Sequence, residues 1–300
     1  MSHLETALPW VRGRHSPLSR DQLMLLLAAV NQLFLGVDTY LAHSISGTIR
    51  PWEWTPIVFG PVAGLLLLVA GLIALRWRTP AMGIAFVTLL ASVAVGLVGS
   101  WLHWQRAVLP AAPAGQTLAV YLLVWAPPLL GPLAFCGVGV LGMSAAWIER
   151  PADSGRLALP WGRSLPMPFS KTRGYYLLVG LGVLAALLSS VLDHARTGYD
   201  SGWMWLALAV GVFAAAVPIV LGLMPHPRVD DLRVYLGTMV LLIVLGTLGS
   251  ALHVEANLVG EGVVIVERFI RGAPFLAPLL FSNMGLLGII AMMAPTEEWG

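Results

Sequence analysis

The sequence is poor in charged residues and nearly devoid of lysine and cysteine. Only 11% of its 300 residues are charged, whereas soluble domains carry roughly 25%. Lys171 is the only lysine and Cys136 the only cysteine, which excludes an internal disulfide and any Cys-rich zinc or iron–sulfur site. The sequence contains no basic cluster interleaved with aromatic residues, so we expect no binding of nucleic acid. No phosphate loop, catalytic triad or paired catalytic carboxylates assign the chain to an enzyme class.

Apolar residues dominate the composition instead. They make up 58% of the chain, and the mean hydropathy is +0.82. Twelve tryptophans suit the aromatic belts of a protein embedded in a lipid bilayer. A transmembrane helix needs about 20 mostly apolar residues. Eight segments reach that length, so we expect an all-α polytopic membrane bundle with spans at 21–43, 56–76, 82–103, 127–148, 174–194, 204–224, 233–253 and 274–294.

The distribution of Lys and Arg predicts the orientation of these spans. With the N-terminus inside, five basic residues fall on the outer side: Arg50, Arg106, Arg196, Arg268 and Arg271. Twelve fall on the inner side: Arg12, Arg14, Arg20, Arg76, Arg78, Arg150, Arg156, Arg163, Lys171, Arg173, Arg228 and Arg233. The bias places both termini in the cytoplasm, as in a multi-pass protein of a bacterial inner membrane. The first apolar run is long enough to span, so we interpret it as an anchor and not as a cleaved signal peptide.

Three ordered sequence blocks recur at a nearly constant offset, which indicates an internal duplication. The first recurs 151 residues later: His43, Gly47, Trp52 and Trp54 as His194, Gly198, Trp203 and Trp205. The second recurs after 150 residues: Gly99, Ser100, Leu102 and His103 as Gly249, Ser250, Leu252 and His253. The third recurs after 146 residues: Pro128, Pro132, Leu133, Phe135, Gly139, Leu141 and Gly142 as Pro274, Pro278, Leu279, Phe281, Gly285, Leu287 and Gly288.

The duplication predicts the domain organisation. We expect a cytoplasmic tail over 1–20, a first four-helix repeat over 21–148, a polar linker over 149–173, a second repeat over 174–294 and a tail over 295–300. Four spans per half make the repeats parallel, so equivalent residues lie at the same depth. The short apolar stretches 118–126 and 262–270 are expected to form helices on the outer surface.

Four of the seven histidines are candidate cofactor ligands. His3, His15 and His226 are expected in solvated segments. His43, His103, His194 and His253 end the first, third, fifth and seventh expected spans, and all of these run outward. Small or hydroxyl-bearing residues lie one turn before each of the four histidines: Thr39, Gly99, Ser100, Ser190, Gly249 and Ser250. We expect these to leave room for a flat group or a close helix, and a hydroxyl to fix the imidazole tautomer through a bridging group.

Each half therefore offers two histidines at one level, which suits a b-type haem held by two axial imidazoles. Arg106 and Arg196 follow their histidines closely and are expected to bind haem propionates. Copper or zinc is the alternative, with Asp193 or Glu255 as additional ligands. These carboxylates are not repeated, however, because Ala42 and Gln105 occupy the corresponding positions.

In its eight spans, its duplication and its histidine pair per half, the chain resembles the architecture of haem A synthases. The likeness is limited to architecture. That family's Glu-x-x-His-Arg motif does not occur here, and its histidines lie on even-numbered helices whereas these lie on odd ones. The resemblance therefore implies no activity and no site residue for this chain.

The sequence predicts a membrane redox protein that binds b-type haem through His43/His103 and His194/His253. It would carry electrons between quinol in the lipid and an extracytoplasmic redox protein, alone or within a larger membrane complex. Two alternatives stay open. One is a copper- or zinc-site protein of an oxidase or metal-handling system. The other is a cofactor-free transporter or structural subunit, although only Asn31, Gln32 and Asn283 are polar near the middle of the spans.

Overall fold

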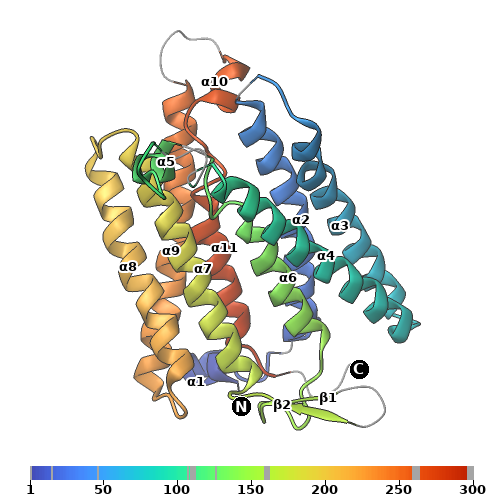
Figure 1. Cartoon of the computed structure of the whole chain (residues 1–300). Coiled ribbons are helices and arrows are strands. Elements are labelled where there is room, and N and C mark those ends of the chain that lie inside the picture. The colour runs from blue at the N-terminus through green and yellow to red at the C-terminus, as the bar shows by residue number, and fades with distance from the viewer. Residues whose placement is uncertain are drawn as a thin grey trace. The chain divides into compact units, whose positions relative to one another are not determined.

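A computed structural model describes residues 2–14, 16–45, 47–106, 108, 113–125, 127–158, 163–258 and 264–295. These residues form eleven α-helices, two short 3-10 helices and one two-stranded hairpin (Figure 1). The chain divides into two compact units, which are described separately. Unit A comprises residues 1–27, 141–184 and 211–300, and unit B comprises residues 28–140 and 185–210.

Six helices are long and apolar enough to cross a membrane. They are α2 (Arg20–Ser44), α3 (Trp54–Ala74), α4 (Arg78–Trp104), α7 (Lys171–Ala195), α8 (Gly202–Leu223) and α9 (Val229–Leu258). Large apolar side chains are exposed along them, for example Leu72 at 70% and Leu223 at 61%. Exposure of this kind is stable only against lipid or another protein. The expected all-α helical membrane bundle is confirmed.

Two expected spans are helical over only part of their length. The segments 127–148 and 274–294 contain α6 (Leu133–Ala146) and α11 (Leu279–Ala291), of 14 and 13 residues. At 1.5 Å per residue each measures about 20 Å, less than the roughly 30 Å of a hydrocarbon core. Prolines explain the difference, because Pro128, Pro132, Pro274 and Pro278 donate no hydrogen bond. Their carbonyls instead accept short-range turn bonds, such as Gly131 N–H to Pro128 O at 3.3 Å.

The remaining helices are short. They are α1 (His3–Ala7), α5 (Val120–Trp125), α10 (Val266–Arg271) and the 3-10 helices η1 (Pro9–Val11) and η2 (Pro51–Glu53). Helix α5 falls within the stretch 118–126 and α10 overlaps the stretch 262–270, ending one residue beyond it; both stretches were expected to form short helices. The solvated state expected for His3 was wrong. Ser2 caps α1, Leu4 N–H donates to Met292 O at 2.9 Å, and His3 Nδ1 lies 2.7 Å from the Tyr176 hydroxyl.

The segment expected as a polar linker contains secondary structure. Strands β1 (Arg156–Ala158) and β2 (Ser164–Pro166) form an antiparallel hairpin. The Glu149 carboxylate is buried and accepts hydrogen bonds from the backbone N–H groups of Asp153, Gly155 and Lys171 at 3.0, 2.6 and 3.1 Å. One carboxylate therefore holds both the turn before the hairpin and the N-terminus of α7.

Small residues allow close helix packing in both units. In unit B, α3 lies beside α4, and Gly36 of α2 approaches the Pro61 ring of α3. A Cβ atom at Gly96 of α4 would lie 2.8 Å from Pro132 O, before α6. In unit A, α9 lies beside α11 (Figure 1), and a Cβ atom at Gly246 would lie 2.6 Å from Pro278 O.

Candidate functional site: a histidine pair in unit B

His43 and His103 are brought together at the C-terminal ends of α2 and α4. Their ring centres are 6.2 Å apart, and the ring planes are inclined by 55°. Both side chains are half-buried. Each histidine lies one residue before the end of its helix, so the pair stands at one end of the bundle of unit B, as the hydropathy pattern predicts.

Backbone carbonyls orient both imidazoles of the pair. His43 Nδ1 lies 2.8 Å from Thr39 O in its own helix, and His103 Nδ1 lies 2.8 Å from Pro128 O. Because a carbonyl oxygen only accepts, each Nδ1 must carry the hydrogen, and each Nε2 then carries the lone pair in the neutral ring. This is the tautomer in which Nε2 binds a metal. The expectation that a hydroxyl one turn below would fix the tautomer was wrong, because carbonyls do so directly.

The space below the pair is closed by a neighbouring turn. A Cβ atom at Gly99 would lie 2.8 Å from Cβ of Pro132, so the small residue serves close packing and leaves no slot for a flat group at that level. Ser100 is 9% exposed, and its Oγ has no hydrogen-bond partner among the described residues. A ligand between the two rings would therefore lie beyond Gly99, nearer to the C-terminal ends of α2 and α4.

His253 of unit A repeats the anchor of His103. Its Nδ1 lies 3.0 Å from Pro274 O, and a Cβ atom at Gly249 would lie 2.9 Å from the Pro278 ring. Helix α9 continues for five residues beyond the expected span end at His253, to Leu258. The side-chain amide of Asn257 stabilises this extension with two hydrogen bonds to Ala273. Its Nδ2 donates to Ala273 O at 2.8 Å, and its Oδ1 accepts from Ala273 N–H at 2.9 Å.

His194, at the end of α7 in unit B, contacts an aromatic side chain. Its ring centre lies 6.2 Å from that of Tyr199, which in turn lies 4.9 Å from that of Trp205. The Tyr199 hydroxyl donates to Val191 O at 2.8 Å. Burial raises the pKa of Tyr199, so the phenol remains a donor at neutral pH. His253 belongs to unit A, so the pairing of His194 with His253 stays a prediction.

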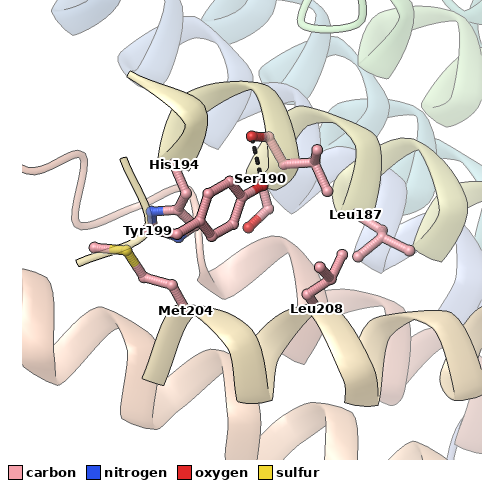
Figure 2. Close-up of a pocket in the computed structure, with 7 residues that line it drawn as sticks. Leu187, Ser190, His194, Tyr199, Met204 and Leu208 are labelled. Carbon is pink, nitrogen blue, oxygen red and sulfur yellow. Dashed lines mark hydrogen bonds between the residues drawn. The ribbon is translucent and has the colours of Figure 1, made fainter. Parts of the chain in front are cut away.

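A shallow hollow lies beside His194 (Figure 2). It leaves no enclosed room even for a water-sized molecule, whereas small-molecule sites have roughly 300–1,000 Å³. The lining residues are Leu187, Ser190, Val191, His194, Tyr199, Met204 and Leu208. Figure 2 shows the rings of His194 and Tyr199 beside the Met204 side chain. Tyr199 and Met204 were not identified from the sequence, because neither belongs to a repeated block.

The two candidate arginines are both exposed. Arg106, with Glu53, lies close enough to act electrostatically on the His103 ring. Arg196 already has protein partners: its Nε donates to Val124 O at 2.6 Å, and its Nη1 lies 3.7 Å from Asp193. Arg196 therefore fixes the end of α5 to the end of α7 within unit B.

Nothing else in the described part of the chain gathers conventional metal ligands, since no three or more His, Cys, Asp or Glu side chains come together there. Comparisons of the chain with protein-family models, with curated proteins and with solved structures give no match.

Proposed function

We propose that the chain is a membrane electron-transfer protein that holds a b-type haem between His43 and His103. The observation that carries the proposal is the pair itself. Two imidazoles from different helices have their ring centres 6.2 Å apart, and both hydrogen-bond a carbonyl through Nδ1.

The ring spacing fits an iron with two axial imidazoles. Two bonds of about 2 Å on opposite sides of a metal, with each ring centre about 1 Å beyond its nitrogen, separate the centres by roughly 6 Å. Two axial imidazoles can have their ring planes at any angle about the common metal–nitrogen axis, so an inclination of 55° is compatible with the arrangement. The carbonyl bonds fix the orientation of both rings.

Haem is favoured over copper or zinc by the number of ligands that the site offers. A structural zinc site takes four protein ligands and a catalytic site three. The described residues provide two histidines here and no group of three or more conventional ligands. A porphyrin supplies four nitrogens of its own, so two histidines are sufficient. Arg106 is the proposed partner of a haem propionate.

The proposed direction of electron transfer follows from the charge bias. With both termini in the cytoplasm of a bacterial inner membrane, the ends of α2 and α4 face outward. A haem there would accept electrons from quinol in the lipid and pass them to an extracytoplasmic redox protein. By the sequence repeat, His194 and His253 are the proposed ligands of a second haem, with Arg196 near its edge.

The test is the visible spectrum of the purified full-length protein, produced in cells supplied with haem. We expect an α band in the reduced-minus-oxidised spectrum. His43→Ala and His103→Ala should remove the same share of the haem, because an iron with two axial histidines needs both. His226→Ala, which changes an exposed loop histidine, is the matched control and should retain the full spectrum.

Each alternative outcome has a definite meaning, provided that the variants still insert and elute as single species. A colourless, metal-free wild-type protein would refute the proposal. Copper or zinc bound in place of haem would refute the haem proposal and support the alternative of a copper- or zinc-site protein. Unchanged haem content in both alanine variants would show that His43 and His103 are not the ligands.

A further inference from the structure

The N-terminal ends of α2 and α7 are joined by two reciprocal hydrogen bonds within unit A. Arg20 Nη1 donates to Thr172 Oγ1 at 2.6 Å, and Lys171 Nζ donates to Asp21 Oδ2 at 2.5 Å. Arg20 of α2 thus contacts the residue that follows Lys171 in α7. Lys171 contacts the residue that follows Arg20 in α2. All four residues are buried. Such an exchange is the pattern of contacts across a two-fold axis.

The sequence offset supports the same correspondence. An offset of 151 relates His43 to His194, and it also relates Arg20 to Lys171. The preceding serines, Ser19 and Ser170, correspond at this offset too. Each accepts a hydrogen bond from the backbone N–H three residues later, at 3.3 and 3.4 Å. The two helices therefore begin with the same cap.

Burial along the two helices follows the same offset. Seven buried positions of α2 correspond to seven buried positions of α7. In α2 they are Arg20, Asp21, Met24, Ala28, Ala29, Gln32 and Gly36, and in α7 Lys171, Thr172, Tyr175, Val179, Gly180, Val183 and Leu187. Corresponding faces of the two helices are thus buried, although their side chains differ.

A third set of hydrogen bonds recurs within each half of the sequence. Cys136 Sγ donates to Val93 O at 3.3 Å, and Ser282 Oγ, at the corresponding position, donates to Ile243 O at 2.9 Å. The bond from His103 to Pro128 O likewise recurs from His253 to Pro274 O. These bonds reproduce the offsets of 150 and 146 seen in the sequence.

We infer that the N-terminal end of each half's first long helix is a surface that pairs with its counterpart in the other half, as in a parallel dimer, within unit A. A pseudo-two-fold axis passes between Arg20–Asp21 and Lys171–Thr172. The partner that this surface fits is the other copy of the same four-helix unit. The inference does not depend on a bound cofactor.

The test is to move the Asp21 carboxylate across the axis. Asp21→Thr removes the charged partner of the Lys171 ammonium, which then keeps only its bond to Trp147 O at 2.7 Å among those described, and should lower the thermal midpoint of the detergent-solubilised full chain by roughly 5 °C or more. If the axis exists, Asp21→Thr combined with Thr172→Asp should recover most of that loss. The carboxylate at 172 would then accept the hydrogen bond that Arg20 now gives to Thr172.

A matched control tests whether rescue needs the carboxylate at position 172 or only a carboxylate anywhere in the first turn of α7. Gly174→Asp in the Asp21→Thr background places a carboxylate in the same first turn of α7, where the helix dipole favours it too, but away from the reciprocal position. Because a Cβ atom at Gly174 would lie 3.3 Å from the Phe169 ring, its midpoint is compared with that of Gly174→Asn in the same background, which has the same shape and no charge. Gly174→Asp should not restore the midpoint. If Asp21→Thr does not fold, the yield of monodisperse protein in the two rescue backgrounds becomes the readout. The inference is overturned if Thr172→Asp fails to rescue, or if Gly174→Asp rescues equally well.

Discussion

The ion pair between Lys171 and Asp21 should contribute more to stability than any exposed pair of the protein. The two side chains are 4% and 1% exposed, and Nζ lies 2.5 Å from the carboxylate. Removing one partner of a buried pair costs about 3–5 kcal/mol, because the other charge remains in a medium of low polarity. Lys171→Met, which keeps the length of the side chain, is the perturbation of choice.

The structure indicates where in that range the loss should fall. After Lys171→Met, Asp21 retains the Tyr175 hydroxyl at 3.0 Å and Arg20 Nε at 3.6 Å, so we expect a loss near 3 kcal/mol. Asp21→Leu should cost more, about 4–5 kcal/mol, because it leaves two buried cations beside each other. The double variant should lose less than the sum of the two single losses, by about 2–3 kcal/mol.

Equilibrium unfolding in mixed micelles, followed by tryptophan fluorescence, would measure these free energies. The control is Arg271→Met, which breaks an exposed pair with Glu267 at 2.9 Å and should cost at most about 0.5 kcal/mol. If Lys171→Met costs no more than this control, or if the two losses in the buried pair simply add, the reasoning about buried charge is wrong.

Two further predictions concern packing and pH. Gly96→Ala and Gly246→Ala should each destabilise the protein by about 1–3 kcal/mol, because the added methyl groups meet backbone carbonyls, whereas Gly237→Ala, with no atom within 4 Å, should be neutral or slightly stabilising in the same unfolding assay. Burial lowers the pKa of His3 from 6.5, so the docking of α1 should be strongest above that pH and weaken as the pH falls through and below it. Hydrogen exchange of the α1 amides should show this loss of protection, and His3→Gln, which retains a hydrogen-bonding side chain toward Tyr176, should abolish the pH dependence.

Hydropathy was sufficient to locate the long helices, because a segment that crosses a bilayer has little freedom in length. The expected span 21–43 is α2 at Arg20–Ser44, and 82–103 is α4 at Arg78–Trp104. Hydropathy failed where backbone chemistry decides the structure. Prolines shorten α6 and α11, and the side-chain amide of Asn257 extends α9 beyond His253. Neither effect changes the apolar content of a window, so no count of apolar residues would detect it.

The candidate site shows the same division between local pattern and long-range contact. Helical spacing placed His43 and His103 at the ends of their spans, and the structure brings their rings together. The carbonyl that orients His103 lies 25 residues away at Pro128, in a turn whose path the sequence did not indicate. The small residues below the histidines were expected to leave room for a flat group or a close helix. Gly99 and Gly249 instead accommodate the neighbouring proline turn and leave no space for a macrocycle at that level.

The two pairs of corresponding histidines differ in their hydrogen bonds and ring contacts. This difference concerns the number of haems that the chain would bind. His103 and His253 share an anchor, since each donates to the carbonyl of the proline that opens the turn before α6 or α11. His43 and His194 do not. His43 bonds the carbonyl one turn earlier and faces another histidine, whereas His194 faces Tyr199 at the edge of a small hollow. The haem content distinguishes the two numbers of cofactors. A haem-to-protein ratio of two would support the proposed second site at His194 and His253, and a ratio of one that falls to zero in His43→Ala would limit the proposal to the His43/His103 pair.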